Sequence, residues 1–221
     1  MHNSINNLIA IEKEIQQKLF LNKKQNLLPK IIAVSKTFPM QDILPLINHG
    51  HIHYGENKVQ ESVEKWTEIK KDFNHIQLHM IGKLQTNKVK HVVPLFDFIH
   101  SLDNLRLAKK ISEEQVKKNK KLKIFIQVNI GMEEKKSGIT PDKLESFYNI
   151  CKNELKLDIV GLMCLPPNNN DTKTSFSEMF NYKEKTGAEE LSMGMSNDYL
   201  EATTYGATFL RIGSKIFGPR S

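Results

Sequence analysis

Cysteine and long hydrophobic runs are scarce in this chain of 221 residues. The two cysteines, Cys151 and Cys164, have neither the spacing of a zinc site nor the number that a disulfide framework needs. The longest apolar passage, HVVPLFDFI (91–99), contains Pro94 and Asp97, and it is too short and too polar to span a bilayer. The first twenty residues show helical spacing of apolar side chains without a signal-peptide core. We therefore expect a cytoplasmic protein with no membrane partner and no metal.

Arginine is also scarce, although the chain carries a formal net charge of +7. An excess of positive charge usually indicates an anionic partner. Only Arg106, Arg211 and Arg220 are arginines, and lysine lacks the planar fork that reads phosphates and bases. The lysines also alternate with acids, as in KKISEEQVKKNKKLK (109–123). We interpret the charge as a surface bias and expect no nucleic-acid partner; binding that falls steeply with salt would indicate the alternative.

A glycine-rich phosphate turn of the G-x-G-x-x-G kind is absent, which argues against a doubly wound dinucleotide fold. What the sequence does contain is a regular alternation of apolar segments with longer amphipathic ones. Eight parallel strands that alternate with helices are the number that closes a barrel. We therefore predict an α/β fold, a single (β/α)8 TIM barrel over residues 1–221, with strands at 31–35, 52–55, 77–81, 96–100, 124–129, 159–165, 190–194 and 209–213.

The segments between these strands predict helices, and one further helix comes before the first strand. We expect helices within 40–49, 57–71, 103–118, 141–155 and 198–206, and a polar loop at 166–175. The chain ends soon after the eighth strand, which leaves no room for a final helix. We predict that an additional N-terminal helix, over about residues 4–20, fills that gap.

The loops after the last two strands have the composition of a phosphate site. They read LSMGMSND (191–198) and LRIGSKIFG (210–218), and glycine lets backbone N–H groups approach a ligand closely. Ser196 is predicted at the start of a helix, where the helix dipole favours an anion. Barrels often bind phosphate with the loops after strands seven and eight. The two loops together predict a phosphate-binding site.

Lys36, in IIAVSKTFPM (31–40), ends the first strand in the same parity as Ile32 and Val34. It should therefore face the mouth of the barrel. A lysine attacks a carbonyl only when desolvation or a neighbouring cation lowers its pKa. An amine at one end of a site and a phosphate at the other suit pyridoxal 5′-phosphate (PLP). They also suit a Schiff-base aldolase that acts on a sugar phosphate, and spacing alone does not separate the two.

The order of several motifs resembles the pyridoxal phosphate homeostasis protein family from about residue 30 to the end of the chain. The motifs are AVSKT (33–37), YGENKVQE (54–61), HMIGKLQTNK (79–88), SLD (101–103), QVNI with EEKKSGI (127–139), GLMCLPP (161–167), LSMGMSND (191–198) and RIGSKIFGPR (211–220). That family is similar to the N-terminal barrel of alanine racemase (fold type III), without its second, β-rich domain.

The resemblance implies PLP as the cofactor and assigns residues to it by motif. Lys36 matches the lysine that forms the internal aldimine, the Schiff base with PLP. Arg211 matches an arginine near the pyridine nitrogen. The remaining cofactor-binding matches are Ser196, Gly213 and Ser214 at the phosphate, Asn57 near the 3′-oxygen, and Met195 and Met163 in the wall of the pocket. Lys136 matches a position that influences cofactor transfer, and Lys135 directly precedes it.

The resemblance also implies a carrier rather than an enzyme, so we assign no catalytic residue. A guanidinium does not release its proton, so Arg211 keeps the ring nitrogen of PLP unprotonated and the ring is a poor electron sink. Of the five tyrosines, only Tyr54 lies near a strand end, and its ring suits core packing equally well. We expect a monomer that holds PLP and delivers it to apo forms of PLP-dependent enzymes. The alternatives are a racemase-like PLP enzyme of low activity and, third, an aldolase.

Overall fold

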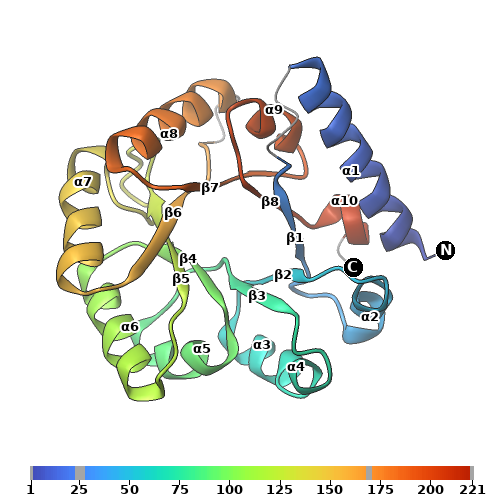
Figure 1. Cartoon of the computed structure of the whole chain (residues 1–221), viewed down its shortest axis with the longest axis horizontal. Coiled ribbons are helices and arrows are strands. Elements are labelled where there is room, and N and C mark those ends of the chain that lie inside the picture. Colours follow the sequence, from blue (N-terminus) through green and yellow to red (C-terminus); the bar gives the residue numbers. More distant parts are fainter. Residues whose placement is uncertain (1, 23–27, 168–170, 220–221) are drawn as a thin grey trace.

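The computed structural model describes residues 2–22, 28–167 and 171–219. Eight parallel strands form a closed barrel in which each strand pairs with the next and β8 pairs with β1 (Figure 1). The strands are β1 (Lys30–Val34), β2 (His53–Glu56), β3 (Gln77–Met80), β4 (Phe98–Leu102), β5 (Lys123–Val128), β6 (Asp158–Cys164), β7 (Glu190–Met195) and β8 (Phe209–Ile212). The predicted TIM barrel is confirmed, and every strand lies within two residues of its predicted bounds.

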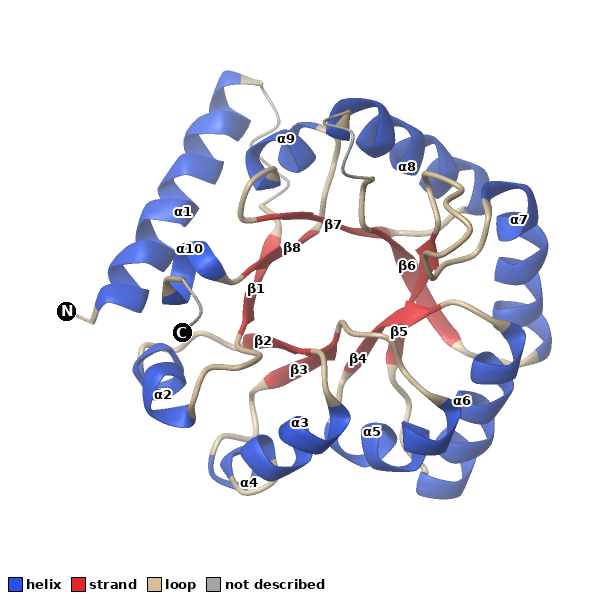
Figure 2. Ribbon diagram, turned by 180° about the vertical axis from the view of Figure 1, so that it is seen from behind, coloured by secondary structure: helices blue, strands red, loops and turns tan. Residues whose placement is uncertain are grey.

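Helices surround the barrel on the outside (Figure 2). They are α1 (Asn3–Leu21), α2 (Met40–Asn48), α3 (Val59–Trp66), α4 (Ile69–Asp72), α5 (Val89–Leu95), α6 (Leu105–Lys118), α7 (Pro141–Asn149), α8 (Thr172–Thr186), α9 (Tyr199–Thr204) and α10 (Ser214–Phe217). A 3-10 turn, η1 (Thr86–Lys88), precedes α5, and a π-helical turn, η2 (Ile150–Glu154), extends α7. Among the helices of these described ranges, none combines the length and the apolar character that crossing a bilayer requires.

Three of these helices differ from the sequence predictions. The polar segment 166–175 is not wholly a loop, because α8 begins at Thr172, where the Asp171 side chain accepts the backbone N–H of Thr174. Residues 168–170 of that segment lie outside the described residues. α5 was not predicted, since it is short and contains Pro94. The chain after β8 does form a helix, the single turn α10.

The N-terminal helix α1 fills the gap in the ring of helices, as predicted. Its buried apolar side chains are Leu8, Ile11, Ile15 and Leu19, which lie on one face at the spacing of an amphipathic helix. It packs against α9, α10 and α2 (Figure 1, blue beside red). The first helix of the chain therefore covers the part of the barrel wall beside the last strands, where the ring of helices has a gap.

The barrel interior is narrow at Gly161 of β6. A Cβ atom there would lie 2.2 Å from the carbonyl oxygen of Glu190 in β7 and 2.7 Å from Cε1 of Phe125. Glu190 is paired with Gly161 in the sheet, so its backbone cannot move without breaking the strand register. Glycine is therefore needed here for the close approach of β6 and β7.

We expect Gly161→Ala to lower the free energy of unfolding by about 3 kcal/mol, because overpacking against backbone is costly. Chemical denaturation of both proteins measures this difference. Gly187→Ala is the matched control: its φ is 68°, but a Cβ there meets no atom within 4 Å. The control should lose only about 1 kcal/mol from backbone strain. Equal losses in the two variants would contradict the packing argument.

Candidate functional site

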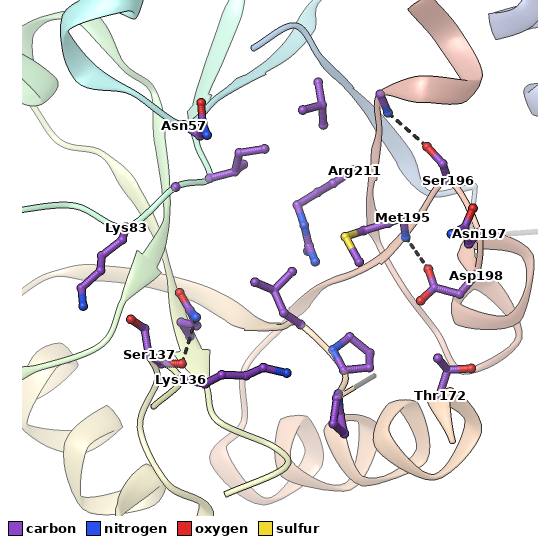
Figure 3. A pocket seen from close by; sticks show the side chains of 18 of the residues that line it. Asn57, Lys83, Lys136, Ser137, Thr172, Met195, Ser196, Asn197, Asp198 and Arg211 are labelled. Atoms are coloured by element: carbon purple, nitrogen blue, oxygen red, sulfur yellow. Dashed lines mark hydrogen bonds between the residues drawn. The ribbon is translucent and has the colours of Figure 1, made fainter. Parts of the chain in front are cut away.

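A cavity of about 910 Å³ opens at the carboxyl ends of the strands. Seven of the eight cofactor-binding residues predicted from the sequence, all but Met163, line this cavity: Lys36, Asn57, Met195, Ser196, Arg211, Gly213 and Ser214. They come from β1, β2, β7 and β8 or from the loops that follow these strands. Figure 3 shows Ser196 and Asn57 on different sides of the cavity, with Arg211 between them. Segments far apart in the sequence thus converge at one mouth.

The two glycine- and serine-containing loops lie side by side. The backbone N–H of Gly213 donates to Oγ of Ser196 across 3.4 Å, which joins the loop after β8 to the loop after β7 (Figure 3). Ser214 directly follows Gly213 and is exposed at the cavity. The hydroxyl groups of Ser196 and Ser214 are therefore two neighbouring donors for an anion.

The prediction that Ser196 starts a helix is wrong. α9 begins at Tyr199, and Asp198 precedes it as the cap residue. The Asp198 carboxylate accepts the backbone N–H of Met195, which folds residues 195–198 into a turn. Aspartate and asparagine in SND favoured this turn over an earlier helix start. The anion-binding capacity of this loop therefore rests on hydroxyl and backbone donors and not on a helix dipole.

The same two loops are tied together from behind by α1. The Tyr199 hydroxyl, on α9, donates to the carboxylate of Glu14, on α1. Lys215, on α10, donates to Glu14 at 3.3 Å and to the Tyr199 hydroxyl at 2.9 Å. One carboxylate of the N-terminal helix thus holds the helix after each loop.

Lys36 lies just after β1, and α3 holds the residues on either side of it. The Lys65 ammonium donates to the carbonyl oxygen of Ser35 at 3.1 Å, and Glu61 accepts the backbone N–H of Thr37 at 2.9 Å. Both neighbours of Lys36 are therefore fixed. Lys36 itself is half-buried and lines the cavity.

The anchor of this arrangement is Glu56, whose side chain is fully buried. Its Oε1 atom accepts from Ser35 Oγ at 2.7 Å, from Lys65 Nζ at 3.1 Å and from Trp66 Nε1 at 3.0 Å. Lys65 is only 10% exposed at its side chain. A buried charge of this kind is tolerated only with its partner present.

Lys65→Met should therefore lower the free energy of unfolding by about 3 kcal/mol, because it leaves the Glu56 charge buried and unpaired. Denaturant titration of both proteins gives the difference. The matched control is Lys71→Met, which breaks an exposed pair with Glu68 (side chains 65% and 76% exposed) and should cost less than about 1 kcal/mol. A Glu56→Gln, Lys65→Met double variant should recover part of the loss; no recovery would show that Lys65 acts through packing alone.

Arg211 reaches the floor of the cavity from β8. Its Nη1 donates to Oγ of Ser192 at 2.7 Å and its Nη2 donates to the carbonyl oxygen of Cys164 at 2.8 Å. Only 4% of the residue is exposed, and this burial lowers the pKa of the guanidinium. Both acceptors are neutral. A buried cation with neutral partners favours an acceptor on its cavity side.

Asn57 is placed by a close contact with the loop after β3. A Cβ atom on Gly82 would lie 2.3 Å from the carbonyl oxygen of Asn57, so glycine is required for this approach. Oδ1 of Asn57 is buried and has no hydrogen-bond partner among the described residues. An unpaired buried acceptor beside a cavity fits a donor on a ligand or on water.

Lysines gather on the wall opposite the serine loops. Lys83, Lys135 and Lys136 line the cavity there, and Figure 3 shows Lys83 and Lys136 across from Ser196. Lys136 pairs with Glu133 at 2.7 Å, with both side chains about two-fifths exposed (38% and 42%). Lys83 was not assigned to the site from the sequence, although it follows the end of β3.

Two further expectations concern residues away from the cavity. Met163 does not line it: it is 1% exposed and packs inside the barrel with Ile32, Phe98, Phe125 and Phe209. The alternation along β6 turns Met163 inward but below the cavity floor.

Tyr54 is fully buried, its hydroxyl donates to the carbonyl oxygen of His51, and burial raises the pKa of this hydroxyl. Within the described ranges, no group of three or more His, Cys, Asp or Glu side chains could hold a metal ion.

Comparison with known proteins places these residues in a family. Residues 13–221 match the family model described as "Alanine racemase, N-terminal domain". A pyridoxal phosphate homeostasis protein of Pasteurella multocida is 35% identical over 224 residues, with 97% of this chain and 96% of that protein covered. One of Aquifex aeolicus is 38% identical over 200 residues, with 86% and 87% covered. The solved structure of PipY from Synechococcus elongatus with PLP bound is 31% identical, has a TM-score of 0.78, and covers 92% of this chain and 100% of its own.

Proposed function

Because this chain belongs to the family of pyridoxal phosphate homeostasis proteins, we propose that it binds PLP in the cavity, holds it as a Schiff base with Lys36 and delivers it without turning over an amino acid. One observation carries the proposal: a lysine, a buried arginine and two serine-containing loops surround a single cavity. The solved structure of the relative PipY with PLP bound supports the choice of ligand.

The residues present fit this ligand. The hydroxyls of Ser196 and Ser214 and the backbone of Gly213 would hold the phosphate. Arg211 would donate to the ring nitrogen, which supplies the acceptor that its buried guanidinium lacks on the cavity side. Asn57 would contact the ring through its unpaired amide oxygen or its amide N–H groups. When bound, PLP supplies an aldehyde that reacts reversibly with amines.

Two features oppose turnover of an amino acid. A guanidinium remains protonated, so Arg211 can only donate and leaves the ring nitrogen without a proton. Proton transfer at a substrate also needs a second acid or base beside Lys36. Tyr54 cannot serve, because it is buried away from the cavity. Among the described residues that line the cavity, none is a tyrosine, a histidine or a cysteine, and the Asp198 carboxylate is engaged with the backbone N–H of Met195. The lysines of the opposite wall are the other titratable groups there, and the exchange experiment below tests them.

Binding measurements on three related compounds test the proposal. PLP should bind with an absorption band that borohydride abolishes. Pyridoxine phosphate, which lacks the aldehyde, should bind without forming the band. Pyridoxal, which lacks the phosphate, should bind about 100-fold more weakly than PLP, since it loses several charge-assisted hydrogen bonds. Equal affinity for PLP and pyridoxal would contradict the phosphate assignment.

Incubation with D- and L-alanine in deuterated water separates a carrier from an enzyme. We expect no exchange of the α-proton above that of free PLP. Exchange that depends on Lys36 would instead establish a racemase-like activity.

A second experiment tests delivery. The PLP-loaded protein is mixed either with an apo PLP-dependent enzyme or with a trap for free PLP. The activity of the enzyme should return faster than PLP is released into the trap. Equal rates would show release through solvent and would remove the delivery part of the proposal.

A further inference from the structure

A row of histidines runs through the barrel interior to Arg211. Nδ1 of His53 lies 3.0 Å from Nε2 of His79, and Nδ1 of His79 lies 2.9 Å from Nε2 of His100. Nδ1 of His100 lies 2.8 Å from Oγ of Ser192, which accepts from Arg211 at 2.7 Å. We call these three histidines and Ser192 the histidine row. It links four strands, β2, β3, β4 and β7, to the cavity floor.

The row is enclosed by aromatic rings and closed to water along most of its length. His79 stacks on Phe98 with 4.2 Å between ring centroids, and His100 stacks on Phe125 at 4.3 Å. His79, His100 and Ser192 are fully buried, whereas His53 is partly exposed. Burial lowers the pKa of His53 to about 4 and those of His79 and His100 well below their ordinary value. All three rings are therefore neutral at neutral pH.

Neutral rings give the row a direction. Each neutral imidazole has one N–H and one acceptor nitrogen, so the protons along the row must all point the same way. Oγ of Ser192 has two side-chain partners among the described residues, Arg211 and His100. Arg211 can only donate, so the Ser192 hydroxyl proton has His100 Nδ1 as its acceptor. The opposite direction would leave a buried hydroxyl proton unbonded, which is unfavourable.

We propose that the histidine row is a hydrogen-bond relay of fixed direction that holds Arg211 beneath the cavity, with His100 and Ser192 as positioning residues for its contact with PLP. In this arrangement His53, His79 and His100 all carry their proton on Nε2. Ser192 donates to His100 and offers its lone pair to Arg211, which fixes the plane of the guanidinium. The contact with PLP rests on the proposed function; the direction of the row does not.

The direction of the row is tested on the ligand-free protein by NMR. Long-range correlation of ring protons with ring nitrogens in protein labelled with 15N-histidine identifies the tautomer of each ring. We expect Nε2–H with unprotonated Nδ1 at His79 and His100. An Nδ1–H tautomer at either ring would overturn the proposed direction. This measurement does not depend on PLP.

The positioning role is tested by substitution of His100. His100→Leu removes the nitrogen that accepts the Ser192 hydroxyl proton. The asparagine of His100→Asn has nearly the same shape as that leucine, and its amide oxygen can replace the lost acceptor. We expect His100→Leu and Ser192→Ala to raise the dissociation constant of PLP about tenfold, the effect of one hydrogen bond to a charged group. Both should shift the absorption band of bound PLP, and His100→Asn should lie closer to the wild type in both measures.

His51→Gln is the control, because the His51 ring bonds to the carbonyl oxygen of His53 and lies outside the row. It should change neither the affinity for PLP nor the band. If the wild-type protein binds PLP and the His100→Leu variant shows the same band and the same affinity, the positioning role alone is overturned. Wild-type protein that fails to bind PLP would instead refute the proposed function, and the positioning role with it. A band shift of equal size in all variants, the control included, would show a general loss of packing and would also overturn it.

Discussion

Lys36→Ala should abolish the PLP absorption band that borohydride removes and raise the dissociation constant of PLP at least about 100-fold. The reason is that the proposed Schiff base is the one covalent contact, whereas the phosphate and ring contacts are hydrogen bonds of modest net strength. Side chains of α3 hold the neighbours of Lys36 in place, so removal of the Lys36 side chain leaves the cavity wall intact. Absorption spectra of the two proteins with added PLP measure this effect.

Lys136→Ala is the matched control, since Lys136 lines the same cavity from the opposite wall. The band should remain in this variant, because Lys136 is exposed and paired with Glu133. Retention of the band in Lys36→Ala together with its loss in Lys136→Ala would move the Schiff base to the opposite wall. Loss in both variants would show that the two lysines act together.

Ser214→Asp should weaken PLP binding about 100-fold, because it places a carboxylate beside the phosphate of the ligand in a half-enclosed cavity. Ser214 is exposed, so the variant should fold with unchanged stability. Equilibrium dialysis with PLP measures the affinity. Pyridoxal, which carries no phosphate, should bind this variant and the wild type equally.

Ser137→Asp places the same charge in the same cavity away from the serine loops (Figure 3). Ser137 directly follows Lys136, and its replacement should change the affinity for PLP only a few-fold. Equal losses in the two aspartate variants would show that PLP responds to the charge of the whole cavity. In that case the phosphate would not be assigned to the loops after β7 and β8.

The barrel could be predicted because its strands are buried on both faces and read as short apolar runs. The closure by α1 followed from counting, since eight strands left one position in the ring of helices unfilled. The start of α8 could not be read, because Asp171 and the threonines that follow suit a loop as well as a helix cap. Helix α5 was hidden by Pro94, which is tolerated near a helix end.

Lys36, Ser196, Gly213 and Ser214 could be predicted because they follow strand ends, which converge in a barrel. Asn57, Met195 and Arg211 were assigned from the family resemblance. Two features depended on details that alternation does not fix. Met163 has the inward parity of a cavity residue but lies a layer too deep. The histidine row needs three strands in register, and the sequence shows only that His53, His79 and His100 each lie in a strand. Lys83 lacked any signal beyond its place after β3.

The central claim is that Lys36 forms the bond to PLP at this cavity. Reduction of the PLP-loaded wild-type protein with borohydride, followed by proteolysis and mass spectrometry, locates the modified lysine directly. The account predicts one modified peptide, which contains Lys36, in an amount that matches the loss of the absorption band. Modification at Lys83, Lys135 or Lys136 in place of Lys36, or spread evenly over surface lysines, would contradict it.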